Sequence, residues 1–227
     1  MGRFGKTCKQ YIIIMCIDNN QLLRFSVIQL LLFLVVAAAS AQKPLTDEQK
    51  ARQQNVRWQY AEAQKYAEQQ KKDNYAGQYV TVKWPRIMAA VGKVEETIEY
   101  FSQLKEDEKT SMPVYELQLV RSSLKRPEAS IGDNYSEFLF DIATGNLTFY
   151  FNTHVYWWCG EEVKVETRCY YNSDGTFSSG SVKLKPVKGV GEPFYPEELQ
   201  DIDGLDAVRE SCRYKTSFDY IANYSME

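Results

Sequence analysis

The segment LTFYFNTHVYWWCGEEVKVETRCYY, residues 147–171, decides the fold because large apolar residues alternate with polar ones along most of its length. Alternation with a period of two is typical of a strand that buries one face. The odd positions are apolar on both sides of Gly160, which favours a turn there. We therefore predict two antiparallel strands, 147–158 and 161–171, joined by a three-residue loop that places Cys169 opposite Thr153.

The residues before this segment predict a second hairpin. Gly145-Asn146 is a dipeptide that suits the primed turns of two-residue hairpin loops. A loop of that length pairs Ile142 with Phe149 and Phe140 with Phe151, which places the large apolar side chains on one face. A slip by one residue would move them to the other face.

The residues after it predict a third hairpin. A loop over Asn172–Gly175 pairs Val165 with Val182 and Val163 with Leu184. These pairs keep the apolar residues of both strands on the face that carries the apolar residues of the first two predicted hairpins. The chain from this region to its end carries one further helix signal, Leu205–Cys212, with Asp203 as its N-cap.

The chain upstream of the meander predicts a strand and a helix. Gln78–Trp84 alternates like a strand and ends at Pro85. Apolar residues then recur at spacings of three and four, which favours an amphipathic helix; they are Ile87, Val91, Val94, Ile98 and Phe101. With a further strand over Tyr115–Val120, the predicted fold class is α+β, a long amphipathic helix packed on an antiparallel β-meander of about five strands.

The order strand, long helix, meander resembles cystatin-like folds. Gln78-Tyr-Val80-Thr-Val82 begins like the Gln-x-Val-x-Gly loop of cystatins, but it ends in Val and precedes the helix, whereas the family's loop follows it. The paired C-terminal disulfides of cystatins are also missing. The resemblance therefore implies an architecture and does not imply protease inhibition.

The N-terminal residues predict export. Val27–Ala39 is an apolar run preceded by Arg24 and followed by the small-x-small pattern Ala39-Ser40-Ala41. The run is shorter than the roughly 20 residues of a membrane span, so we expect a cleaved signal peptide over 1–41 and no retained membrane anchor. The predicted localisation is secreted, extracellular.

The rest of the chain divides into an arm and a domain. Residues 42–75 are rich in Gln, Ala, Lys and Glu and carry a thin apolar stripe, so we predict a polar helical or disordered arm. A propeptide released after Lys71-Lys72 is the alternative. Residues 76–227 form a single α+β domain in this interpretation.

Secretion leaves three cysteines and three glycosylation sequons in the mature chain. The predicted hairpin holds Cys159 and Cys169 about 20 Å apart, too far for a disulfide. We therefore predict a bridge from Cys212 to Cys169, with Cys159 as the alternative partner; the remaining thiol is unbonded or links two chains in a dimer. Glycosylation is predicted at one or more of the sequon residues Asn134, Asn146 and Asn223.

The composition excludes several functions. A formal charge of −3 over 227 residues argues against a nucleic-acid partner. His154 is the only histidine, and neither a nucleophile-elbow motif nor a phosphate-binding glycine motif is present. We therefore predict no enzyme, no metal and no cofactor.

The strand Leu147–Trp158 carries the most informative surface. Its even positions, expected to face outward, combine aromatic rings with polar tips and suggest a contact surface; they include Tyr150, His154, Tyr156 and Trp158. The predicted rim of this patch is Lys164, Glu166 and Arg168.

The predicted function is a secreted, non-enzymatic binding protein for an extracellular protein or small ligand. An extracellular structural or matrix component is the alternative, and a secreted inhibitor or enzyme is less favoured. A second possibility for the face is that the arm or the C-terminal segment covers it.

Overall fold

The structure is a computed structural model that describes residues 44–73, 78–88, 92–106, 113–125, 133–158, 161–187 and 204–223. Leu45–Glu227 forms one compact unit. Its described elements are α2 (Asp47–Asp73), β1 (Tyr79–Met88), β2 (Gly92–Glu106), β3 (Pro113–Lys125), β4 (Asn134–Phe140), β5 (Leu147–Trp158), β6 (Glu161–Tyr171), β7 (Phe177–Pro186) and α3 (Gly204–Asn223). The fold is mixed α+β, as predicted, but the sheet has seven strands instead of about five.

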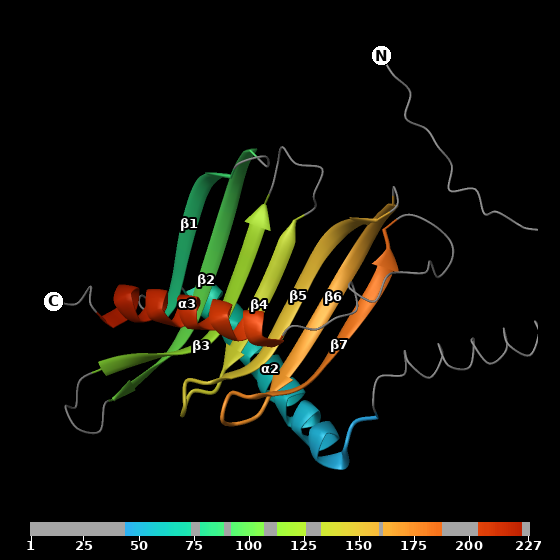
Figure 1. Cartoon of the computed structure of the whole chain (residues 1–227). Helices are drawn as coiled ribbons and strands as arrows, with labels where there is room; N and C mark the ends of the chain where they lie inside the picture. Colours follow the sequence, from blue (N-terminus) through green and yellow to red (C-terminus); the bar gives the residue numbers. More distant parts are fainter. Residues whose placement is uncertain are drawn as a thin grey trace, which may run out of the picture. The chain divides into compact units, whose positions relative to one another are not determined.

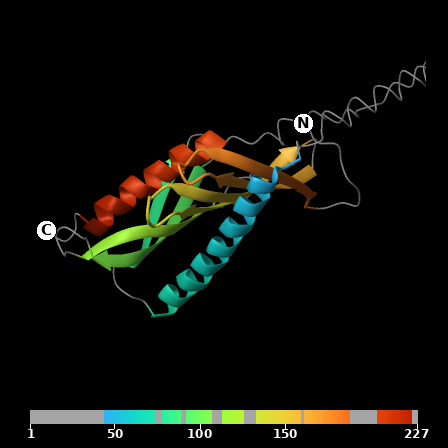
Figure 2. The same ribbon diagram turned by 90° about the horizontal axis from the view of Figure 1, so that it is seen from below.

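The sheet is an antiparallel meander in which every strand pairs with its neighbours in the sequence, in the order β1 to β7 (Figure 1). The two described helices lie on opposite sides of it, α3 on one face and α2 on the other (Figure 2). The sheet therefore has two buried faces, which agrees with the possibility that the C-terminal segment covers part of the outward face of residues 147–158.

The helix predicted over residues 87–101 is wrong. This region forms the β1–β2 hairpin, in which Ile87 pairs with Lys93 and Val82 pairs with Ile98. Ile98 packs in the cluster on the α3 side, whereas Phe101 packs in the cluster on the α2 side. The predicted stripe combined Ile87 of β1 with apolar residues on both faces of β2, which imitates the spacing of three and four of a helix. The β-branched side chains of Val94 and Ile98 favour the strand.

The predicted arm contains α2. The helix begins with a capping box, in which Gln49 N donates to Thr46 Oγ1 at 3.2 Å and Thr46 N donates to Gln49 Oε1 at 3.0 Å. Its thin apolar stripe, Val56, Ala63 and Ala67, is fully buried against the sheet. The segment that resembled a solvated arm is therefore a structural helix of the unit.

Each face of the sheet has a row of large side chains that crosses it. The α2 face carries aromatic and aliphatic residues from five strands, namely Phe101, Leu119, Leu139, Phe149 and Tyr170. The α3 face carries a larger cluster that includes Tyr100, Val120, Phe138, Phe140, Leu147, Cys169 and Tyr171, on which the Tyr214 and Phe218 side chains of α3 pack. Both rows follow the cross-strand registers of the sheet.

Two predicted hairpins exist with a different register. In β4–β5 the loop is longer than Gly145-Asn146, so that Leu139 pairs with Phe149 and Phe140 pairs with Leu147. Phe140 and Phe149, which were predicted to share one face, therefore lie on opposite faces of the sheet. Gly145 has a φ of 67°, the left-handed conformation that this turn requires. In β6–β7, Val165 pairs with Leu184, a shift of two residues that leaves the predicted faces unchanged.

The β5–β6 hairpin differs by an odd number of residues, which exchanges the faces. Trp158 pairs with Glu161, so that only Cys159 and Gly160 lie between the strands. Tyr150 therefore lies opposite Cys169, where we had predicted Thr153. Because side chains alternate with a period of two, the even positions of β5 share a face with the apolar residues of β6.

The chain order matches the cystatin-like order only in part, because the first described helix precedes the sheet. Gln78-Tyr-Val80-Thr-Val82 enters β1, an edge strand. The predicted helix near Leu205 is confirmed as α3, which continues to Asn223. Asp203, its predicted cap, lies outside the described residues.

Candidate functional site

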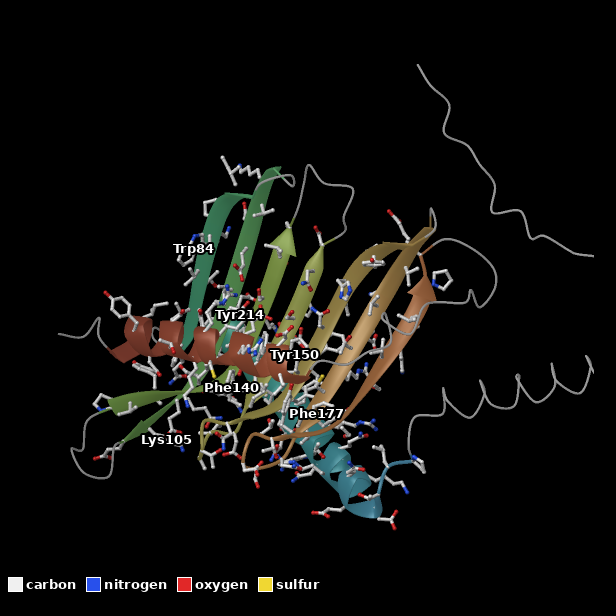
Figure 3. The ribbon with its side chains drawn as sticks, in the orientation of Figure 1. Trp84, Lys105, Phe140, Tyr150, Phe177 and Tyr214 are labelled. Atoms are coloured by element: carbon white, nitrogen blue, oxygen red, sulfur yellow. The ribbon has the colours of Figure 1, made fainter. Side chains whose placement is uncertain are left out.

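The predicted binding residues occupy different environments along β5. Tyr150 packs against the α3-side core, with its ring centroid 5.0 Å from that of Phe138. Burial raises the pKa of the Tyr150 hydroxyl well above its usual value. Figure 3 shows Tyr150 next to α3, so the C-terminal helix covers this end of the predicted face.

The other predicted residues extend beyond α3. His154 is half-buried, and its Nδ1 lies 2.8 Å from Asn152 Oδ1. Tyr156 is 41% exposed. The backbone of Trp158 pairs with Glu161 at the end of β5, whereas its side chain lies outside the described residues. The structure thus separates Tyr150 from the accessible part of the predicted site.

Cross-strand pairs connect His154 to residues far away in the sequence. Reading across the sheet, Trp84 pairs with Glu96, Glu96 with Leu124, Leu124 with Asn134, and Asn134 with His154. Directly paired residues point to the same face. We call the side chains Trp84, Leu124, Asn134, His154 and Tyr156 the distal surface.

Trp84 is the residue that sequence reasoning missed. It is 61% exposed and lies on β1 beyond α3, on the side from which Figure 3 views the sheet. Its alternation with Val80 and Val82 predicted a strand. Because residues 87–101 were predicted as a helix, this strand was not paired with the rest of the sheet, and Trp84 was not placed on the same face as the residues of β5. The β1–β2 register was the missing signal.

The opposite face of the same strands is charged. Val155 pairs with Lys164, Thr153 with Glu166, and Phe151 with Arg168. Lys164, Glu166 and Arg168 therefore lie on the α2 side of the sheet, and the prediction that they form the rim of the aromatic patch is wrong. The one-residue change in the β5–β6 loop is the physical reason.

A polar cluster borders the distal surface where α3 meets the sheet. Glu96 is 6% exposed, and its Oε1 accepts hydrogen bonds from Tyr214 Oη at 3.1 Å and from Arg213 Nη2 at 3.2 Å. Ser122 Oγ donates to the same oxygen at 3.3 Å. Tyr214 Oη also lies 3.0 Å from Glu210 Oε1, and burial raises the pKa of both Tyr214 and Glu210.

A second buried polar cluster joins α2 to the other face. Arg121 Nε donates to Glu137 Oε1 at 3.0 Å, and Arg121 Nη1 donates to Glu68 Oε1 at 2.8 Å. Gln64 Nε2 lies 3.0 Å from both Glu137 oxygens, which also accept from the Tyr60 and Tyr135 hydroxyls.

Burial raises the pKa of Glu137 to about 7. The Arg121 and Glu137 side chains are each at least nine-tenths buried. A substrate has no access to groups enclosed in this way, so the cluster fixes α2 on the sheet and is not an active site.

The cysteines lie apart in the structure. Cys169 is buried in the α3-side core, whereas Cys212 is exposed on α3. The predicted Cys169–Cys212 bridge is therefore not present. The alternative partner Cys159 lies outside the described residues. Cys169 lies opposite Tyr150, far along β5 from the end nearest Cys159, which agrees with the exclusion of a Cys159–Cys169 bridge.

The sequon residues differ in their surroundings. Asn134 begins β4, and its Oδ1 accepts from Asn152 Nδ2 at 2.5 Å. Asn146 lies in the β4–β5 turn and donates through Nδ2 to Ser173 O at 2.9 Å. Asn223 is the last residue of α3, and its side chain lies outside the described residues. Both Asn134 and Asn146 are half-buried.

Catalytic and metal-binding geometry is not found in the described ranges. Asp141, the carboxylate that would have to orient His154 in a catalytic pair, instead caps the β4–β5 turn by accepting from Ala143 N and Thr144 N at 2.9 Å. Within the residues that the structure describes, no three His, Cys, Asp or Glu side chains gather as a metal site would require. None of the helices described here has the length and apolarity to cross a membrane.

Comparison of the chain with protein-family models, with curated proteins and with solved structures finds no match. Function is therefore inferred from the geometry above.

Proposed function

We propose that the protein is a secreted glycoprotein that acts as a non-enzymatic binding protein, and that an extracellular protein docks on the distal surface. The observation that carries this proposal is the exposure of two large rings on the apolar side of the sheet, Trp84 at 61% and Tyr156 at 41%. Aromatic residues are enriched at the centres of protein interfaces.

The contrast between the two sides of the strands supports this surface. On the α3 side, Val163 and Val165 are buried and pack with Val182 and Leu184. On the α2 side, the residues between them, Lys164 and Lys183, are exposed. Where α3 does not cover it, the sheet therefore has one apolar face and one charged face. An apolar face with exposed aromatic rings is a typical contact surface.

Polar groups at the border supply specificity. The Glu96, Arg213 and Tyr214 side chains are already held by one another, and Arg213 remains about half exposed. A guanidinium fixed in this way loses little conformational entropy on binding. It provides a cation for a carboxylate of the partner beside the aromatic contacts.

The test compares secreted variants. Trp84→Ala and Tyr156→Ala remove rings from the distal surface, and Trp58→Ala removes an equally exposed ring from α2. The partner is isolated by cross-linking in the extracellular medium and identified by mass spectrometry. We expect the first two variants to lose about 2 kcal/mol or more of binding free energy, as interface aromatics do, and Trp58→Ala to bind like the wild type. Equal binding by all four proteins would contradict the proposal.

Glycan positions give a second check. A glycan on Asn134 would occupy the distal surface, because that residue pairs with His154. The proposal therefore expects the glycans on Asn146 or Asn223. Glycopeptide mapping of the secreted protein decides this, and full occupancy of Asn134 would argue against a protein partner at this surface.

A structural or matrix role is the second candidate, and the exposed thiol of Cys212 favours it. Exposed cysteines form disulfides in oxidising compartments, and this one lies on the outer side of α3. A disulfide-linked dimer that is seen on a non-reducing gel and disappears in Cys212→Ser would support this role.

A further inference from the structure

A cavity lies at the opposite end of the molecule from the distal surface, between the N-terminal turns of α2 and the β6–β7 turn. Its volume is about 750 Å³, within the range of about 300–1,000 Å³ typical of small-molecule sites. The residues that the argument uses are Gln49, Arg52, Asn55, Asn172, Ser173 and Phe177. Figure 3 shows Phe177 at the start of β7.

Hydrogen bonds fix the α2 wall of the cavity. The capping box holds Gln49, whose Nε2 also donates to Ser178 O at 2.9 Å. Arg52 Nε donates to Tyr171 O at 3.0 Å, which ties the guanidinium to β6. These bonds connect the first turns of α2 to the turn on the other side of the cavity.

The turn that forms the other wall is also fixed. Asn172 N donates to Thr176 O at 2.8 Å, and Gly175, with a φ of 83°, donates back to Asn172 O at 3.0 Å. Ser173 O accepts from Asn146 Nδ2 at 2.9 Å. A site whose walls are already ordered loses little entropy when a ligand binds.

The lining chemistry selects for a neutral ligand. Among the described residues that line the cavity, Glu48 is the one carboxylate and Arg52 the one guanidinium, so their charges offset each other. Asp47 adds a second carboxylate in the same helical turn, which disfavours an anion. The remaining polar groups are amides and hydroxyls, which both donate and accept.

One aromatic ring in the cavity is exposed. The Phe177 ring is 42% exposed, and its packing against Tyr171 at 6.0 Å fixes its position. An exposed ring beside planar amides suits a ligand that has one C–H face and many hydroxyl groups.

We propose that this cavity binds a neutral polyhydroxylated ligand, that is, a sugar residue of a glycan or a free saccharide. The exposed amides of Asn55 and Asn172 contact the hydroxyl groups, and the Phe177 ring packs on the C–H face. The site is separate from the distal surface, so saccharide binding can be tested independently of the proposed protein partner.

The experiment is saturation-transfer difference NMR on the full secreted protein. The probes are maltose, cellobiose, lactose and N,N′-diacetylchitobiose, with 3′-sialyllactose and glucuronic acid as anionic comparisons. Each is used at about 10 mM, which nearly saturates a site with a Kd of about 1 mM. We expect at least one neutral saccharide to bind and both anionic sugars to bind more weakly.

Variants locate the binding. Asn55→Ala and Phe177→Leu should weaken binding of that saccharide about tenfold or more, equivalent to one decade in Kd, while Gln54→Ala, an exposed neighbour that does not line the cavity, should bind like the wild type. Thermal unfolding checks that each variant is folded. No signal from any neutral saccharide, stronger binding of the anionic sugars, or unchanged binding by Asn55→Ala would overturn the proposal.

Discussion

The two helices cover the same sheet by different physical means. α3 inserts Tyr214 and Phe218 into an aromatic core, where the Phe218 ring lies 5.7 Å from that of Tyr100. α2 buries only Val56 and two alanines as apolar anchors. Its attachment depends instead on polar contacts, such as Lys71 with Glu99 at 2.7 Å and Gln70 Nε2 with Ser102 O at 2.9 Å.

The difference explains why the burial of α2 against the sheet was not predicted from local patterns. Burial of aromatic area stabilises a helix with no requirement on partner geometry. Buried polar contacts stabilise one only when every partner is in place, because an unmatched buried group costs more than a matched one gains. We expect the α3 interface to be stronger and the α2 interface to depend more on pH.

The largest expected effect is at the α3 interface. Phe218 is fully buried, and Phe218→Ala should lower the free energy of unfolding by about 3–5 kcal/mol because it leaves a cavity in the core. Urea unfolding followed by fluorescence measures this loss.

The matched change in α2 sharpens the comparison. Val56→Ala, at the largest apolar anchor of that helix, removes two carbon atoms and should cost about 2 kcal/mol. A loss at Val56 equal to that at Phe218 would mean that α2 is held by apolar burial as strongly as α3.

The next effect is a pH dependence on the α2 side. Burial raises the pKa of Glu137 from 4.5 to about 7, so the folded protein keeps this proton at pH values where the unfolded chain has lost it. Stability therefore falls as pH rises from about 4.5 to 7 and levels off above that. The full span is up to about 3 kcal/mol for one carboxyl group.

Glu137→Gln isolates this contribution. Urea titrations at several pH values measure the difference in the free energy of unfolding between wild type and Glu137→Gln. This difference should shrink or reverse as pH increases across that window. Glu62→Gln, an exposed carboxyl on α2, serves as the control and should leave the wild-type profile unchanged. A pH-independent difference would show that Glu137 stays ionised throughout.

The smallest effect concerns the start of α2. Thr46→Ala breaks the capping box with Gln49 and should cost about 1 kcal/mol. Thr216→Ala, an exposed threonine inside α3, should change stability by less than about 0.5 kcal/mol. Because Gln49 also lines the cavity, hydrogen exchange at the α2 N-terminus reports whether the cap orders that wall.

Local sequence patterns predicted much of the sheet but not its faces. The alternation in β6 and the turn at Asn172–Gly175 correctly predicted the strands and the side on which Val163 and Val165 lie. The three-residue β5–β6 loop was predicted because it places the apolar odd positions of both strands on one face; the structure has a two-residue loop, which is compatible with the pattern because both faces of the sheet are buried. That single residue decided which face Tyr150 occupies.

Long-range packing explains the remaining errors. A strand covered on both faces carries apolar residues at both parities, so β2 read as a helix. The burial of α2 was not predicted because its polar side chains Gln64 and Gln70 find their hydrogen-bond partners only across the tertiary interface. The cavity joins residues about 120 positions apart in the chain, and no local motif marks it.

The unbroken order of the meander has a consequence for how the molecule is made. Every strand pairs with the strand synthesised just before it, so the sheet can grow hairpin by hairpin with short loop closures. The helix that covers Tyr100, Phe138 and Tyr150 is the last described element of the chain. Until α3 has been synthesised, a finished sheet presents an uncovered aromatic face, which is prone to aggregation. We therefore expect nascent chains that lack α3 to depend on chaperones, a need that ends when the final helix docks.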